Sequence, residues 1–301
     1  MEKSATIPTW ERVSTALVVI LPFFGFVVGI IPLWGSGADK TSLSLCVLVY
    51  VYTELSITVG FHRYFTHGSF RIVKRPLKWV LGIGGSMALE GSVFSWVGWH
   101  LKHHSSPDRE GDPHSPHLHK PGFWGFLKGL VHSHVGWMFV TPTQKVRAMK
   151  RLRNDPDAEL IDQWFLVFGF LGLALPVVLG AILRGSFAWA HVDFIWGGLI
   201  RVFLMHHVTW SVNSVCHIWG SQPFDTGDQS RNNPIVGFAA FGEGWHNNHH
   251  QFPSSAQHGL LPGQFDFSWS VIRIFEKFGW ITEIQTPSAD DIQKRLAKVA
   301  S

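Results

Sequence analysis

The sequence predicts an all-α integral membrane protein in which four transmembrane helices support a cytoplasmic helical cap with a histidine-rich metal site. Three observations lead to this fold class: long apolar runs without charges, 15 tryptophans, and 18 histidines that gather in spaced clusters. Only 15% of the 301 residues are charged, whereas a typical soluble domain has roughly 25%. This composition excludes a disordered chain. The two cysteines, Cys46 and Cys216, are too few for a disulfide scaffold or an all-thiolate metal site.

Four segments are expected to cross the membrane, because a helix of about 20 apolar residues spans a hydrocarbon core of about 30 Å. Residues 13–34 carry no charge and no small-residue cleavage site, so a retained span is favoured over a signal peptide. Residues 41–61 contain Glu54 as their only charge, and residues 163–183 contain none. Residues 194–212 are less apolar because they include Arg201, His206 and His207, and charged groups at such positions should face protein rather than lipid.

The basic residues predict the orientation of these spans. Of the 25 Lys and Arg residues, 14 lie between Arg63 and Arg153, whereas Lys40 alone separates the first two spans and Arg184 alone the last two. The positive-inside rule therefore places both termini in the cytoplasm, together with a cap formed by residues 62–162 and 213–301 of a single domain, 1–301. Residues 77–99 are apolar enough to suggest a fifth span, but they are expected not to cross.

Three histidine clusters have the spacing of metal ligands. They are His62 and His67 (HxxxxH), His100, His103 and His104 (HxxHH), and His246, His249 and His250 (HxxHH). In a helix, residues i, i+3 and i+4 share a face, so each HxxHH group is expected to point three rings at one place. Five residues of α-helix turn about 500°, so the first pair is expected where the second span ends and unwinds. Eight imidazoles exceed the three protein ligands of a catalytic zinc, which favours two metals; zinc, copper, iron and nickel all remain open.

The positions of the histidine clusters indicate that residues 77–99 do not cross the membrane. Clusters that share metals must lie on one face of the membrane, so the number of crossings between any two of them must be even. This requirement supports the fourth span, residues 194–212.

Together with the segments NSVCHIWG (213–220) and GEGWHNNHH (242–250), these clusters resemble the membrane-bound fatty acyl desaturases. The likeness covers roughly residues 40–280 and is closest to the cyanobacterial, plant and bacterial branch of the Δ9, stearoyl-CoA-desaturase-like group. It implies an O₂-dependent enzyme that introduces a cis double bond, at Δ9, into a long saturated acyl chain. It also implies two iron ions, His217 as a ninth ligand, Asn213 as a ligand through water, and a kinked substrate tunnel lined by Trp96, Thr209 and Trp210.

Ring N–H groups of metal-binding histidines need acceptors. The candidates are Asp108, Asp112, Asp225 and Glu243, although each also fits a solvated loop or cap residue. Gly98 and Trp99 stand where the animal acyl-CoA enzymes carry Arg-Asp, and Glu90 stands where the family usually has Gln. The acyl substrate is therefore left open among acyl-CoA, acyl-lipid and acyl-carrier-protein forms.

The expected partners are the lipid bilayer, the acyl substrate and a separate electron donor such as ferredoxin or cytochrome b5, because no haem motif or Cys-rich cluster is present. A basic face could dock that donor or lipid head groups, or could simply reflect topology: Lys145, Arg147, Lys150, Arg151 and Arg153. No nucleic-acid partner is expected. The alternatives are a related di-iron hydroxylase or acetylenase and, from another class, a non-catalytic membrane metal-binding or transport protein.

Overall fold

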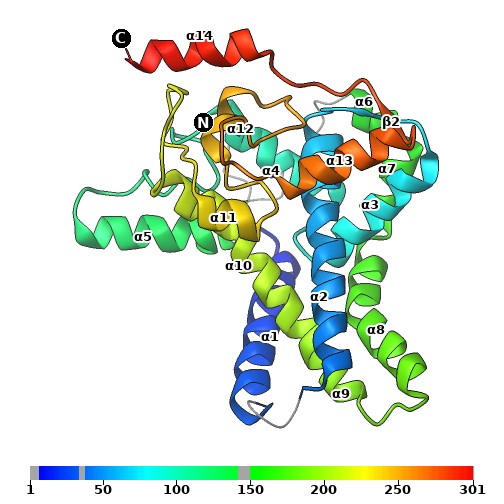
Figure 1. The fold of residues 1–301 in the computed structure, drawn as a ribbon. Helices are drawn as coiled ribbons and strands as arrows, with labels where there is room; N and C mark the ends of the chain where they lie inside the picture. The colour runs from blue at the N-terminus through cyan, green and yellow to red at the C-terminus, as the bar shows by residue number, and fades with distance from the viewer. Residues whose placement is uncertain (1–6, 34–37, 142–149, 301) are drawn as a thin grey trace.

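The computed structural model describes residues 7–33, 38–141 and 150–300. Long helices form a bundle, and a cap of shorter helices and loops lies at one end of it (Figure 1). The bundle contains α1 (Thr9–Leu33), α2 (Lys40–Leu55), α8 (Phe165–Arg184) and α10 (Arg201–Ser214). The α2 helix continues into a π-helix, η1 (Ser56–Thr66), and α10 is preceded by α9 (Ala190–Asp193) and a second π-helical stretch, η3 (Phe194–Ile200).

The cap is built from the remaining elements. Its helices are α3 (Arg75–Met87), α4 (Val93–Ser105), α5 (Phe123–His134), η2 (Gly136–Phe139), α6 (Lys150–Arg153), α7 (Pro156–Gln163), η4 (Val215–His217), α11 (Pro234–Ala239), α12 (His246–Gln251), α13 (Phe267–Lys277) and α14 (Ala289–Ala300). One short antiparallel ribbon departs from the all-α prediction: β1 (Arg71–Ile72) pairs with β2 (Ile281–Thr282). This ribbon ties the segment after η1 to the segment after α13.

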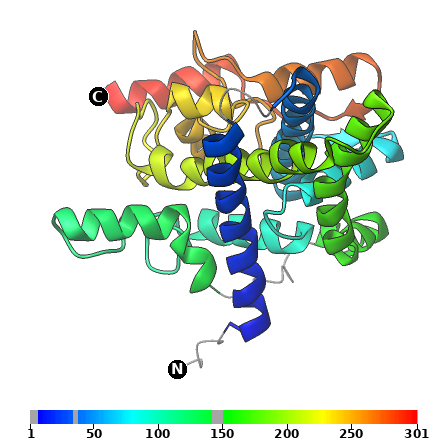
Figure 2. The same ribbon diagram turned by 90° about the horizontal axis from the view of Figure 1, so that it is seen from below.

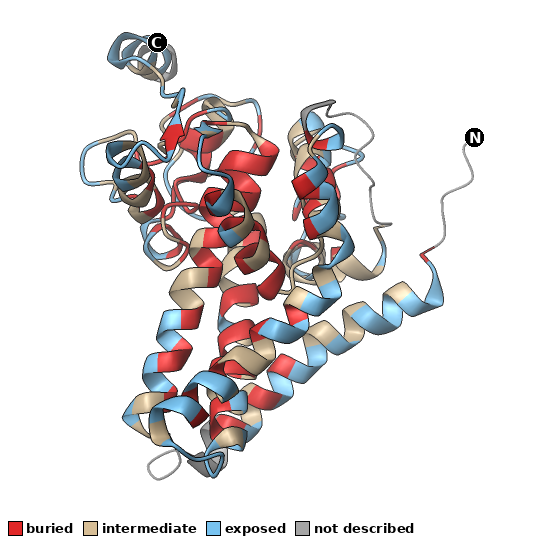
Figure 3. Cartoon of the chain, turned by 90° about the vertical axis from the view of Figure 1, so that its right-hand side faces the viewer, coloured by how far each residue is buried: buried red, intermediate tan, exposed pale blue. Residues whose placement is uncertain are grey.

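Within the part of the chain that the structure describes, three helical segments are long and apolar enough to cross a membrane: Thr9–Gly29, Lys40–Thr66 and Phe165–Arg184. They correspond to the first three predicted spans, although the second extends beyond residue 61. Many large apolar side chains on α1 and α8 face outward, among them Phe24 and Phe170, as the exposed stretches of these helices show (Figure 3). Such surfaces are unfavourable in water and are typical of contact with lipid.

The fourth predicted span is helical throughout residues 190–214 but is not apolar enough to meet the same criterion. Arg201, His206 and His207 lower the hydropathy of this segment, and Arg201 is fully buried. Its guanidinium donates to the carbonyl oxygens of Met87 and Gly172, at 2.9 and 3.0 Å. The charge therefore faces protein, as the sequence analysis expected.

Residues 77–99 fold as two helices, α3 and α4, which are separated by a break at residues 88–92. Each has 13 residues and is therefore about 20 Å long, too short to cross the hydrocarbon core. Glycines in α3 allow this helix to pack closely on η1. A Cβ at Gly84 would lie 2.1 Å from Ser56 Oγ, and one at Gly85 would lie 2.3 Å from the Phe61 ring. This close packing fixes η1, which carries the first two histidines.

Viewed from below, α1 crosses the bundle, and α5 projects sideways from the body of the protein (Figure 2). Of the predicted basic face, Lys145 and Arg147 lie outside the described residues, as do the side chains of Lys150 and Arg151. The basic face therefore stays a prediction.

Candidate metal centre

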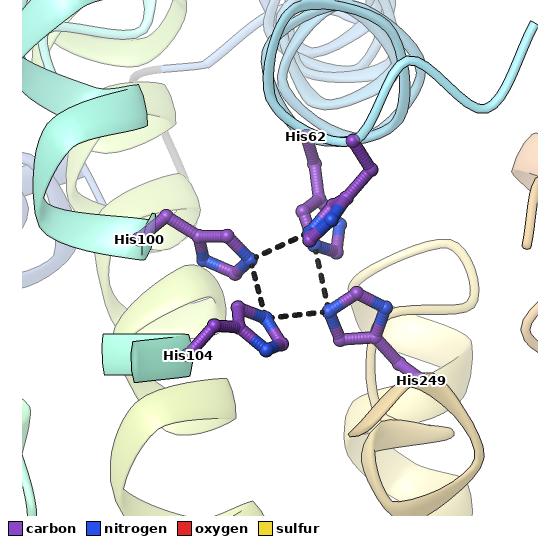
Figure 4. A group of neighbouring side chains, drawn as sticks. His62, His100, His104 and His249 are labelled. Atoms are coloured by element: carbon purple, nitrogen blue, oxygen red, sulfur yellow. Dashed lines mark hydrogen bonds between the residues drawn. The ribbon is translucent and has the colours of Figure 1, made fainter. Parts of the chain in front are cut away.

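The nine histidines expected to bind metal come together in two groups at the junction of bundle and cap. The five-histidine cluster contains His62, His67, His100, His104 and His249, and the four-histidine cluster contains His103, His217, His246 and His250. Within each cluster, the ligand atoms all lie within 4.8 Å of one another. Figure 4 labels His62, His100, His104 and His249 of this cluster, which come from η1, α4 and α12 and point toward one centre.

The two HxxHH groups do not each point at one place, as the spacing alone suggested. On α4, His100 and His104 face the five-histidine cluster while His103 faces the other. On α12 the division is reversed, because His249 joins the first cluster while His246 and His250 join the second. Each of these helices therefore contributes to both clusters, and together they hold the clusters side by side.

The prediction that the chain unwinds between His62 and His67 is wrong. The helix continues as η1, and the His67 amide donates to the His62 carbonyl oxygen at 3.1 Å, an i→i+5 bond. In a π-helix, residues five apart are near neighbours on one face, whereas α-helical geometry would separate them. The wider helical turn thus brings both rings to the same cluster.

Distances between the ring nitrogens suit metal coordination. Within the five-histidine cluster, Nε2 of His104 lies 2.9 Å from Nε2 of both His100 and His249, and the Nε2 atoms of His67 and His100 are 3.0 Å apart. Two nitrogens bound at right angles, each about 2.1 Å from a metal, lie about 3 Å apart, whereas tetrahedral ligands lie about 3.4 Å apart. The spacing favours a metal with more than four ligands.

Buried carboxylates hold the opposite nitrogen of four rings. Nδ1 of His103 donates to Asp112 at 2.9 Å, and Nδ1 of His217 donates to Asp108 at 2.8 Å. Nδ1 of His62 lies 2.6 Å from Glu243. Because a neutral imidazole has one N–H, these contacts leave Nε2 of each ring unprotonated and available to a metal.

The fourth carboxylate is Asp228, not the predicted Asp225. Asp225 is exposed, and its carboxylate accepts from the Gly227 amide at 3.2 Å. Asp228 is buried, and its carboxylate accepts from Nδ1 of His250 at 2.8 Å. Both residues lie in an irregular loop, whose course the sequence does not specify, so nothing in the pattern distinguished them.

Glu243 is held by a group of residues that the sequence analysis did not single out. Nδ1 of His258 lies 3.3 Å from Glu243, and the fully buried Arg63 lies 3.5 Å from Glu243 and 3.2 Å from Asp266. One signal was available: Arg63 directly follows a ligand histidine, and an arginine there needs an acidic partner.

Burial controls the charge of the centre. It lowers the pKa of His67, His100, His104 and His249 well below the usual value, so these rings are neutral and their lone pairs are free. Burial opposes ionisation of Glu243 too, but the neighbouring His62 and His258 rings and the Arg63 guanidinium bring the pKa of that carboxyl well below its usual value. For His217, burial is outweighed by the hydrogen bond to Asp108, which raises the pKa of the ring.

Two small pockets, of about 40 and 50 Å³, adjoin the clusters. Trp96, Thr209, His100 and Asn213 line both, and Trp210 lines the second. The three predicted tunnel residues thus lie together beside the metal ligands, with Trp96 stacked on His100 at 5.1 Å between ring centroids. Asn213 lies in the same wall, and its role as a ligand through water stays a prediction.

This donor set fits a pair of transition-metal ions: nine imidazoles, buried or half-buried, lie in two groups, with carboxylates fixing four of the rings. In agreement with this geometry, the fatty acid desaturase family model matches residues 38–262. The chain belongs to the fatty acid desaturase family. It is therefore an oxidoreductase that acts on fatty acyl chains, and membership argues against the non-catalytic transport alternative.

Relatives of this desaturase act on differently attached acyl chains. A hex-5-enoyl-[acyl-carrier protein] acetylenase from Moorena producens (strain JHB) is 37% identical over 283 residues, 92% of this chain and 88% of its own length. An sn-1 stearoyl-lipid 9-desaturase from Anabaena variabilis is 33% identical over 285 residues, 93% of this chain and 97% of its own. An icosanoyl-CoA 5-desaturase from Limnanthes douglasii is 36% identical over 264 residues, 87% of this chain and 70% of its own.

Proposed function

We propose that the protein is an O₂-dependent desaturase that introduces a cis double bond, at Δ9, into a long saturated acyl chain. The observation that carries this proposal is the pair of histidine clusters beside a cavity lined by Trp96 and Thr209. The overall change is balanced when –CH₂–CH₂–, O₂, two electrons and two protons give –CH=CH– and two water molecules. The two electrons come from a separate donor protein such as ferredoxin or cytochrome b5.

The resident metal in this proposal is iron, with one ion held by each cluster. Removing hydrogen from an unactivated methylene pair requires a redox-active metal and O₂, which excludes zinc as the catalyst. When bound, the iron pair supplies the O₂-derived oxidant. The residues of the chain do the rest: histidine Nε2 atoms hold the ions, buried carboxylates fix the rings, and the cavity wall positions the chain and excludes water.

The membrane arrangement is part of the proposal. Four crossings, with both termini and the cap in the cytoplasm, place the two clusters on the side where acyl substrates and reduced electron carriers are available. Arg201 supports the fourth crossing because its charge is satisfied by backbone carbonyl groups inside the bundle.

An acetylenase is the second candidate, and one relative carries that name. Both reactions remove two hydrogens from adjacent carbons, so the clusters alone do not separate them. The test is expression in a host that lacks this enzyme, with saturated and ω-alkenyl acyl chains supplied. Products are then mapped by gas chromatography and mass spectrometry, with a His249→Ala variant as the matched control.

New Δ9 cis-monoenes that are absent with the variant would support the desaturase. Alkynes formed only from the alkenyl chains would select the acetylenase, and hydroxylated products would select the hydroxylase. Unchanged lipids from a metal-loaded enzyme with a working electron donor would overturn all three.

A further inference from the structure

Glu54 is a carboxyl in the cavity wall that the proposed reaction does not use. It lies near the end of α2 and is 1% exposed. It lines the same cavity as His62, Trp96 and Thr209. Its Oε2 atom is buried and has no hydrogen-bond partner.

The surroundings of Glu54 offer it no cation. Among the described residues, no ion pair includes this carboxyl, and the charged groups that act on it most are Glu90 and Glu243, both acidic. Arg63, the nearest candidate along the chain, is already engaged with Glu243 and Asp266. Ionisable residues inside membrane helices are costly and are therefore a sign of function.

Apolar side chains form the wall of the cavity around Glu54. Ile57, Val212 and Ala240 make this part of the wall apolar, as a passage for a hydrocarbon chain requires. A purely saturated chain seated here would cover the carboxyl and return no hydrogen bond to it. An unmet buried polar group is unfavourable, so a plain methylene chain suits this wall poorly. A carboxyl can accept a hydrogen bond and, when protonated, can also donate one.

We propose that Glu54 is a specificity-determining residue that hydrogen-bonds a hydroxyl group on the acyl chain, so that the preferred substrate is a hydroxyacyl chain. The inference rests on the proposed function and narrows its substrate class. Sites built to hydrogen-bond a substrate hydroxyl discriminate strongly against the analogue that lacks it. A wall that was only a hydrophobic passage would have no use for a buried carboxyl.

The experiment compares stearoyl substrate with a positional series of monohydroxystearoyl substrates, each offered on coenzyme A and on acyl carrier protein. The proteins are the wild type, Glu54→Gln, Glu54→Leu and an exposed control, Glu283→Leu, all with measured metal content. The wild type and Glu283→Leu should show at least tenfold higher kcat/KM for one hydroxy isomer than for stearoyl. Glu54→Gln should keep that preference because an amide still hydrogen-bonds. Glu54→Leu should lose it and gain activity on stearoyl.

Higher kcat/KM of the wild type for stearoyl than for every hydroxy isomer would overturn the inference while leaving the desaturase intact. An unchanged ratio in Glu54→Leu would do the same. If Glu54→Leu does not fold, two measurements on the wild type still decide the matter. One is its ratio of kcat/KM for the hydroxy isomer to kcat/KM for stearoyl. The other is its thermal stabilisation, which should be larger with free hydroxystearate than with stearate. Absence of oxidation of any chain by the metal-loaded wild type is a different result, because it rejects the proposed function itself.

Discussion

Nε2 of His103 and Nε2 of His250 lie 3.2 Å apart, while Nδ1 of each ring faces its own carboxylate, Asp112 and Asp228. Both Nδ1 atoms carry the ring proton, so both Nε2 atoms present lone pairs to each other. Burial lowers the pKa of both rings, which keeps them neutral. Two lone pairs at this distance repel one another unless a cation lies between them. The arrangement is therefore explained by a bound metal ion.

This relationship predicts the metal content of the protein and of its variants. The wild type should bind about two metal ions per chain. His250→Ala should retain about one, because it breaks only the four-histidine cluster, and His104→Ala should retain about one for the complementary reason. His191→Ala, an exposed histidine remote from both clusters, should bind two. Elemental analysis of purified protein measures these values, and a wild type with only one ion at full activity would contradict the two-metal arrangement.

Activity should depend on the same nine histidines. Replacement by alanine of any one of them should abolish desaturation, because neither cluster tolerates the loss of a ligand. His217→Ala is the most informative variant, since this residue lies outside the three spaced clusters and its assignment came from resemblance. Near-normal turnover of His217→Ala in the expression assay would remove the ninth ligand and leave the other eight in place.

The carboxylate beside His250 is Asp228 and not the predicted Asp225. These two residues therefore provide a matched pair of variants. Asp228→Asn should weaken metal affinity about 10–100-fold, the usual effect of losing a carboxylate behind a ligand histidine. Asp225→Asn should leave affinity unchanged because that side chain is exposed. Competition with a chelator measures both. Equal losses in the two variants would show that the loop, rather than the Asp228 carboxylate, determines affinity.

Asp157 should contribute a pH-dependent part of the stability. Its carboxylate accepts from Arg75 at 2.7 Å and from Trp79 at 3.1 Å, which joins α7 to α3. The hydrogen bond from Arg75 lowers the pKa of Asp157 from 3.8 to about 2. A lowered pKa in the folded state stabilises the protein above pH 4, and this contribution disappears as the pH falls toward 2.

Asp157→Asn should therefore lower Tm by about 2–4 °C at pH 7, and the difference from the wild type should shrink between pH 4 and pH 2. Thermal unfolding in detergent across this range measures the effect. Asp290→Asn, which alters an exposed carboxyl on α14, is the control. A difference that stays constant down to pH 2 would assign the loss to packing instead of charge.

The proposed topology predicts which positions an impermeant thiol reagent can reach. Single cysteines at Lys120 and Ser288 should be protected in intact cells and labelled after permeabilisation, whereas one at Ser186, between α8 and α9, should be labelled from outside. All three positions are exposed, and the native Cys46 and Cys216 are buried. If only one of Lys120 and Ser288 were labelled in intact cells, the chain would cross the membrane an odd number of times between them. The histidines of each cluster would then lie on opposite sides of the membrane and could not share a metal ion.

The sequence by itself determined the family, the apolar helices and the identity of eight histidines in three spaced clusters. These properties depend on composition and local spacing: an uncharged run of about 20 residues predicts a span wherever it lies, and histidines spaced as HxxHH come near one another on any helix. Resemblance added His217, which spacing alone would not have singled out.

Only the tertiary structure decided how those histidines divide. His103 faces away from its neighbours His100 and His104 because α4 lies between the two clusters, and no local pattern encodes where another helix will lie. The π-helical turn between His62 and His67 likewise arises where η1 packs against the glycines of α3. Asp228 and His258 reach their partners through loops whose course depends on contacts distant in the sequence. Local periodicity is set by backbone geometry, whereas these contacts are set by packing between segments.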